Sequence, residues 1–203
     1  MVLRRCSVRR SDHPSFVVGI GGSAGGLPAY RSLLATLPAD TGMAFVFIAH
    51  LKPDEKSWLT QILSTCTPMR VLQAAASMPI QANQVYVIPP NVNLLVERLA
   101  FKVVSPRTMH GGRHHQVDLF LISLADAVGA RAVGVIFSGG DGDGTEGCLR
   151  IKAKGGRTFA QDRSAEVDSM PLHAIASGCV DAVLSPIELS KELVRMAVSA
   201  RSS

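Results

Sequence analysis

Residues 16–26, FVVGIGGSAGG, join a short apolar run to a glycine-rich turn. The apolar run at 16–20 indicates a buried strand, and the apolar spacing that follows predicts a helix at 26–37. A strand, a tight glycine turn and a helix in this order form the repeating unit of open α/β sheets.

The same alternation continues along the chain. Residues 44–49 (AFVFIA) and 132–137 (AVGVIF) predict two further buried strands, and strands of this kind that alternate with helices predict a doubly wound, mostly parallel α/β sheet with helices on both faces. Residues 84–88, 93–97 and 101–104 predict a small antiparallel hairpin at one edge. The other predicted elements are helices at 58–63, 117–128, 145–153, 171–176 and 186–200, and strands at 158–160 and 180–184.

The bulk composition is that of one globular domain. The chain has 203 residues, of which 47% are hydrophobic and 18% charged, and its formal net charge is +5. Much of that charge lies in residues 1–14, where four arginines make a basic arm. Such an arm can contact nucleic acid or an acidic membrane, but chain ends are usually loose. We therefore expect a disordered tail at 1–14, one folded domain at 15–200 and no nucleic-acid partner.

The cysteines and the hydropathy favour a cytoplasmic chain. The 4 cysteines stand far apart, without CxxC or His/Cys ligand spacing, so we expect neither a zinc site nor a disulfide. No apolar run reaches the ~18 residues that a membrane span needs, and no apolar segment of signal-peptide type follows the N-terminal charges. We expect no membrane insertion.

The first glycine run fits two motifs. Gly19-x-Gly21-x-x-Ala24 fits a dinucleotide-binding turn, whereas Gly21-x-Ser23-x-Gly25 fits a nucleophile elbow. A dinucleotide site requires an acid about 20 residues on, at the end of the second strand, but that strand ends in Ala49-His50. A histidine at the carboxyl end of the second strand suits a hydrolase, because a serine nucleophile at the carboxyl end of the first strand needs a neighbouring base. The alternatives are an N-cap role for Ser23 and a capped surface position for His50.

The second glycine run, residues 138–147 (SGGDGDGTEG), follows the third apolar strand and falls at the same edge. A catalytic triad needs a carboxylate to orient the histidine, and spacing alone leaves Asp141 and Asp143 as equal candidates. A calcium loop is the rival, although the D-x-D pattern stops after two aspartates. A turn that caps the next helix is the other alternative. Backbone N–H groups around Ala24 and Gly140 are candidate oxyanion donors.

Several separated motifs resemble one family. GGSAGG at 21–26, AHLKP at 49–53 and GVIFSGGDGDGTEG at 134–147 resemble the catalytic domain of the chemotaxis protein-glutamate methylesterases, and the resemblance extends over about residues 16–196. YVIPPN at 86–91, VDLFLISLA at 117–125, TFAQD at 158–162 and MP at 170–171 add to it.

The resemblance implies a role for each matching residue. Ser23 would be the nucleophile, His50 the general base and acid, and Asp143 the orienting carboxylate, because 138–144 matches the family pattern S/T-G-x-x-x-D-G. The substrate- or oxyanion-binding residues would be Ala24, Gly140 and Met170.

The implied activity is hydrolysis of glutamate γ-methyl esters on chemoreceptor cytoplasmic helices, with release of methanol and, in some members, deamidation of glutamine. The resemblance implies no cofactor, and the ligand spacings described above predict no metal. Chemosensory signalling proteins are expected as further partners. The sequence departs from the best-known members of this family in three ways. The chain has no room for an N-terminal receiver domain, so we expect a stand-alone form. In addition, Gly140 replaces a Met and Ala24 replaces a Thr. A non-catalytic binding module and a nucleotide-dependent oxidoreductase are the competing hypotheses.

Overall fold

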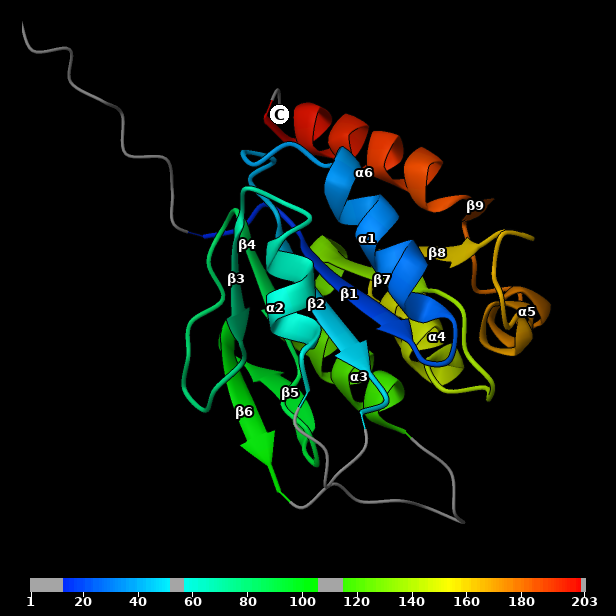
Figure 1. Ribbon diagram of the computed structural model, residues 1–203, viewed down its shortest axis with the longest axis horizontal. Coiled ribbons are helices and arrows are strands. Elements are labelled where there is room, and N and C mark those ends of the chain that lie inside the picture. Colours follow the sequence, from blue (N-terminus) through cyan, green and yellow to red (C-terminus); the bar gives the residue numbers. More distant parts are fainter. Residues whose placement is uncertain (1–12, 52–56, 106–114, 202–203) are drawn as a thin grey trace, which may run out of the picture.

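The computed structural model describes residues 13–51, 57–105 and 115–201, and these contain a main sheet of seven parallel strands (Figure 1). The strands are β1 (Val17–Gly22), β2 (Ala44–Ala49), β3 (Arg70–Gln73), β4 (Gln84–Val87), β7 (Ala132–Ile136), β8 (Arg157–Gln161) and β9 (Ala182–Leu184). Their order in the sheet is β3-β4-β2-β1-β7-β8-β9. The predicted doubly wound parallel sheet is confirmed.

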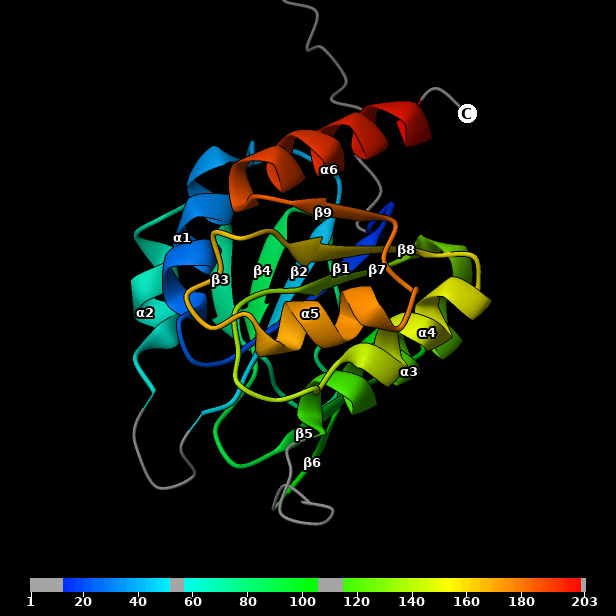
Figure 2. The same ribbon diagram turned by 90° about the vertical axis from the view of Figure 1, so that its right-hand side faces the viewer.

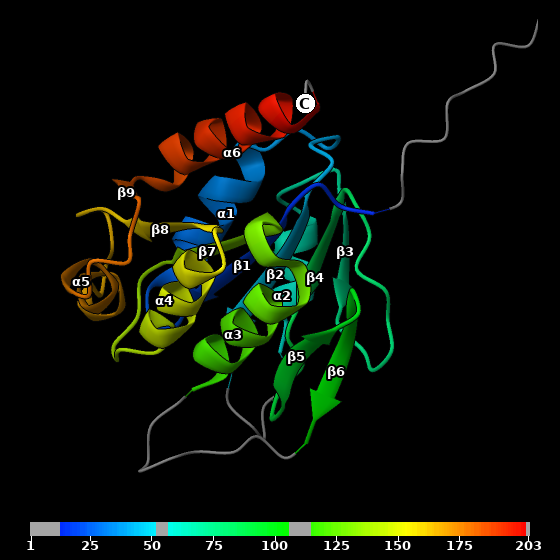
Figure 3. The same ribbon diagram turned by 180° about the vertical axis from the view of Figure 1, so that it is seen from behind.

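Helices cover both faces of this sheet, as the side view in Figure 2 shows. They are α1 (Gly26–Thr36), α2 (Leu59–Ser64), α3 (Gln116–Val128), α4 (Thr145–Ala153), α5 (Ser169–Ala176) and α6 (Pro186–Arg201). α1, α2 and α6 lie on one face, and α3 and α4 lie on the other, toward the viewer in Figure 3. Within the described ranges, none of these helices has the length and apolar character that a bilayer span would require.

The core divides into two layers because alternate strand residues point to opposite faces. Val18 and Ile20 of β1 pack toward α1 and α6, whereas Val17 belongs to the layer under α3 and α4. Gly19 and Gly21 face that second layer. With no side chains at these two positions, α3 packs close to β1.

The order of the strands brings three loops to one edge. β1 lies at the centre, with β2 on one side and β7 on the other, and the sheet register pairs Gly22 with Ala49 and Gly21 with Ile136. The chain leaves β1 toward one face and β7 toward the other, which makes this the point where ligands bind in open α/β sheets. Ser23 and His50 directly follow the paired residues Gly22 and Ala49.

The small antiparallel hairpin is also confirmed, with one correction. It consists of β5 (Asn93–Glu97) and β6 (Ala100–Val104), whose buried residues join the core layer under α3. Residues 84–88, which the sequence grouped with this hairpin, instead contain β4 (Gln84–Val87), which lies between β2 and β3 of the main sheet. The edge strand β3 was not predicted.

The predicted tail lies mostly outside the described residues, which begin at residue 13, so it stays a prediction. Pro14, the last residue assigned to it, is buried, and its carbonyl accepts a hydrogen bond of 3.3 Å from the Arg131 guanidinium.

Candidate active site

His50 and Asp143 form a buried pair at the carboxyl edge of the sheet. The His50 Nε2 atom lies 2.8 Å from Asp143 Oδ2, and the two side chains are 5% and 0% exposed. His50 follows β2 and Asp143 follows β7, so the pair reaches across the end of β1. Because a carboxylate only accepts, Nε2 carries the hydrogen and Nδ1 is left as the basic nitrogen.

The first turn of α3 fixes the Asp143 carboxylate. The Val117 N–H donates to Oδ2 at 3.0 Å, and the Asp118 N–H donates to Oδ1 at 2.9 Å. These N–H groups have no partner inside the helix, and the positive end of the helix dipole favours an anion there. The result is a carboxylate held in one orientation toward the histidine.

Asp141 lies on the opposite edge of the histidine ring. Its Oδ2 is 3.8 Å from His50 Nδ1, its side chain is 29% exposed, and its Oδ1 accepts the Asp143 N–H at 3.2 Å. The geometry thus separates two aspartates that spacing had left equal: Asp143 makes the direct buried contact, and Asp141 faces the other ring nitrogen from solvent.

Ser23 stands at the turn between β1 and α1. Its N–H donates to the Ser138 carbonyl at 2.8 Å, and its own carbonyl accepts from the Gly26 N–H at 3.0 Å. Gly25 adopts φ 71, a left-handed conformation that glycine takes without strain and that makes this sharp turn possible. In the described part of the chain no hydrogen bond joins the Ser23 hydroxyl to His50.

The other predicted site residues lie around this turn. Ala24 and Gly140 are exposed, and their N–H groups donate to no described residue, as an oxyanion site requires. Met170 is fully buried, and its Sδ would be 2.0 Å from a Cβ placed on Gly139. Met170 thus supports the loop from behind, and its contact with a substrate stays a prediction.

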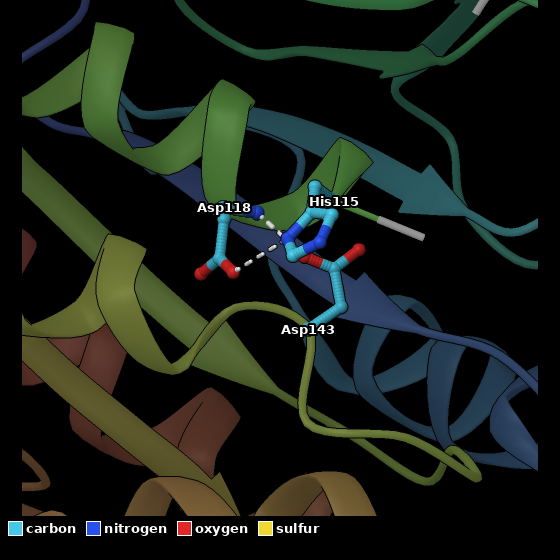
Figure 4. Close-up of side chains that lie close together, drawn as sticks. All are labelled: His115, Asp118 and Asp143. Atoms are coloured by element: carbon cyan, nitrogen blue, oxygen red, sulfur yellow. Dashed lines mark hydrogen bonds and ion pairs between the residues drawn. The ribbon is translucent and has the colours of Figure 1, made fainter. Parts of the chain in front are cut away.

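Two side chains that the sequence did not single out complete the surroundings of Asp143. Figure 4 shows Asp118 and His115 beside Asp143 at the start of α3. The Asp118 Oδ1 accepts the Gly147 N–H at 2.9 Å, and its Oδ2 lies 3.8 Å from His115 Nδ1. Burial first, and the Asp143 charge second, raise the pKa of Asp118 to about 6, although the Gly147 N–H lowers it. An acid in the first turn of a helix was the available sequence clue.

His115, Asp118 and Asp143 are close enough together to be considered as metal ligands. However, both oxygens of Asp143 already accept hydrogen bonds from backbone N–H groups, and one of them also from His50. N–H donors and the positive helix end would repel a cation at this point. The set fits an orienting carboxylate better than a metal centre.

Comparisons with known proteins agree on one family. The model of the CheB methylesterase family matches residues 18–193. A protein-glutamate methylesterase/protein-glutamine glutaminase 3 of Geobacter sulfurreducens is 32% identical over 88% of this chain, which spans 49% of that relative. A putative protein-glutamate methylesterase/protein-glutamine glutaminase of Leptospira interrogans is 30% identical over 91% of this chain and 95% of its own length.

A solved structure shares the fold. The crystal structure of the Thermotoga maritima CheB methylesterase catalytic domain superposes with a TM-score of 0.82, covering 89% of this chain and 98% of that one at 24% identity. The family model spans most of the chain, and the Leptospira relative aligns over nearly its whole length. From this agreement it follows that the chain belongs to the CheB methylesterase family.

Proposed function

We propose that this chain is a serine esterase that hydrolyses γ-methyl esters of glutamate side chains on chemoreceptor cytoplasmic helices, and deamidates glutamine at such sites, in the cytoplasm. The observation that carries the proposal is the buried His50–Asp143 pair, 2.8 Å apart, at the sheet edge where the Ser23 turn ends. The proposed role is adaptation in chemotaxis or a related signalling pathway.

The proposed chemistry is acyl transfer in two steps. The Ser23 hydroxyl attacks the ester carbonyl while His50 Nδ1 takes its proton, and the Ala24 and Gly140 N–H groups stabilise the oxyanion. The tetrahedral intermediate collapses, and methanol leaves with the proton from His50. Water then attacks the acyl-enzyme by the same route and yields the glutamate carboxylate. Asp143 holds the tautomer and stabilises the imidazolium.

In this scheme the two ring nitrogens of His50 have the opposite roles from those in the chymotrypsin-type triad. In the chymotrypsin-type triad Nδ1 faces the aspartate and Nε2 serves as base, whereas here Nε2 faces Asp143. The chemistry is unaffected, because the two imidazole nitrogens exchange roles when the orienting carboxylate is on the other side.

Methanol release from methylated chemoreceptor membranes tests the proposal. Wild-type protein should release methanol, and Ser23→Ala should lower the rate by about 10⁴-fold or more because the nucleophile is gone. The Ser23→Ala protein should keep the wild-type melting temperature, which excludes unfolding as the cause. Equal release by the two proteins would refute Ser23 as nucleophile.

The second candidate is a non-catalytic binding module that docks on a receptor or on a chemosensory signalling protein. It is favoured by the missing hydrogen bond between Ser23 and His50 within the described residues, although catalytic contacts in ligand-free enzymes are often long. A fluorophosphonate probe separates the two, since only a competent nucleophile is labelled.

A further inference from the structure

Ser138, the second residue after β7, is a fully buried polar residue beside the nucleophile turn. Its hydroxyl lies 2.8 Å from the Ala24 carbonyl and 3.1 Å from the Val167 carbonyl, and it accepts the Val167 N–H at 2.9 Å. The one hydroxyl hydrogen can be donated to only one carbonyl at a time, and the shorter contact is to Ala24. The side chain therefore joins the β1–α1 turn to the segment between β8 and α5.

The backbone of Ser138 joins the same elements. Its carbonyl accepts the Ser23 N–H at 2.8 Å, and its N–H donates to Gln161 Oε1, at the end of β8, at 3.0 Å. Every polar group of this residue thus has a partner in the β1–α1 turn, at the end of β8, or in the segment after it. A buried residue used so completely has little freedom to move.

The packing around the turn is equally tight. A Cβ placed on Gly25 would lie 2.6 Å from Ser138 Oγ and 2.7 Å from Glu166 Cβ. The turn is therefore enclosed between Ser138 and the segment before α5, and a small shift of either would be transmitted to Ser23.

The hydrogen bonds also set the direction of the oxyanion donor. The Ser23 carbonyl points to the Gly26 N–H at the start of α1. Since N–H and C=O of a trans peptide point in opposite directions, the Ala24 N–H points away from α1. The bond from Ser138 to the Ala24 carbonyl fixes the next peptide, so both peptides of the turn are held.

We propose that Ser138 is a positioning residue. Its hydroxyl holds the Ser23 turn and the Ala24 N–H in the geometry required for acyl transfer. The inference rests on the proposed esterase function. It does not require that Ser138 touch the substrate.

The test compares Ser138→Ala, Ser138→Thr and Ser190→Ala in the full chain. Ser190 is the matched control, a buried serine whose hydroxyl donates to the Ile187 carbonyl at 2.8 Å in α6. We expect Ser138→Ala to lower kcat for a small methyl ester about 10- to 100-fold, because misplacement by about 1 Å can cost 100-fold. KM should stay within about threefold, since binding contacts are untouched. Phosphonate labelling of Ser23 should slow by a similar factor.

The other variants decide between positioning and general stability. Ser138→Thr keeps the hydroxyl and should recover most of the rate, and Ser190→Ala should lower the melting temperature without changing kcat. Wild-type kcat in folded Ser138→Ala, an equal loss in Ser190→Ala, or a folded but equally slow Ser138→Thr would each overturn the proposal.

If the alanine variant does not fold, Ser138→Cys, with its weaker donor, replaces it and should react at an intermediate rate. Failure of the wild type to react with ester and probe counts against the esterase function, whereas equal reaction of wild type and Ser138→Ala counts against Ser138 alone.

Discussion

His50 lies between two aspartates that carry the same charge in different surroundings. Asp143 is buried and receives three hydrogen bonds, from His50 and from two backbone N–H groups. Asp141 is partly exposed and lies 3.8 Å from the other ring nitrogen. Water screens the contact to Asp141, whereas burial shields the contact between His50 and Asp143 from water. The orienting role therefore falls to Asp143.

Asp143→Asn should lower kcat/KM far more than Asp141→Asn. An asparagine amide at 143 can donate to Nε2, which forces the hydrogen onto Nδ1 and leaves no base toward Ser23; the expected loss is on the order of 10⁴-fold. Asp141→Asn removes a screened charge and should cost at most about tenfold. Steady-state methanol release measures both. The reverse ranking would make Asp141 the orienting acid.

At the scale of elements, the contact of α3 with β1 determines where the first turn of α3 lies relative to Asp143. Gly21 of β1 has no side chain, and a Cβ there would lie 2.3 Å from Val117 Cγ1. The same Val117 supplies an N–H to Asp143. Close approach of helix and strand is thus what brings the N-terminus of α3 to the carboxylate. The glycines before Ser23 serve packing as well as the turn.

Gly21→Ala should lower the free energy of unfolding by about 1–3 kcal/mol, because a β-branched valine cannot easily turn away. It should also lower kcat, since the shift of α3 carries the Val117 N–H away from Asp143. Val117→Ala in the same chain removes the clashing methyl groups, so the double variant should be less destabilised than the sum of the two single changes. Urea unfolding of the four proteins measures this coupling. Simple additivity would show that the close contact does not limit the packing.

Some of the helices and strands could be predicted from the sequence, and others could not. The apolar runs at 16–20, 44–49 and 132–137 marked the central strands, because strands buried on both faces are apolar throughout. β3 (Arg70–Gln73) escaped notice since it is a short edge strand with exposed ends and only two half-buried apolar residues. β4 was assigned to the hairpin because the choice of strand partners depends on contacts far apart in the sequence. Ser138 is part of a matched motif, but its contacts could not be predicted, since they depend on Ala24 and Val167 meeting at one point.

For the whole molecule, the site imposes a cost on folding that depends on pH. Asp118 is buried beside Asp143, and its pKa is raised to about 6. In the unfolded chain an aspartate titrates near 3.9. Between these values the folded protein binds the Asp118 proton more tightly than the unfolded chain does. The stabilisation from this proton is complete below about pH 4 and is lost as the pH rises through about 6.

Asp118→Asn should therefore stabilise the protein at neutral pH. Asparagine can still accept the Gly147 N–H through its Oδ1 but carries no charge beside Asp143. The difference in free energy of unfolding from wild type should be small at pH 4, grow between about pH 4 and 6, and level off on the order of 2 kcal/mol above pH 7. Urea unfolding at several pH values measures it. Asp126→Asn, which changes an exposed acid of the same helix paired with Arg150, is the control and should give no gain. A difference between wild type and Asp118→Asn that does not vary with pH would mean that Asp118 does not titrate in this range and does not couple the pH to folding.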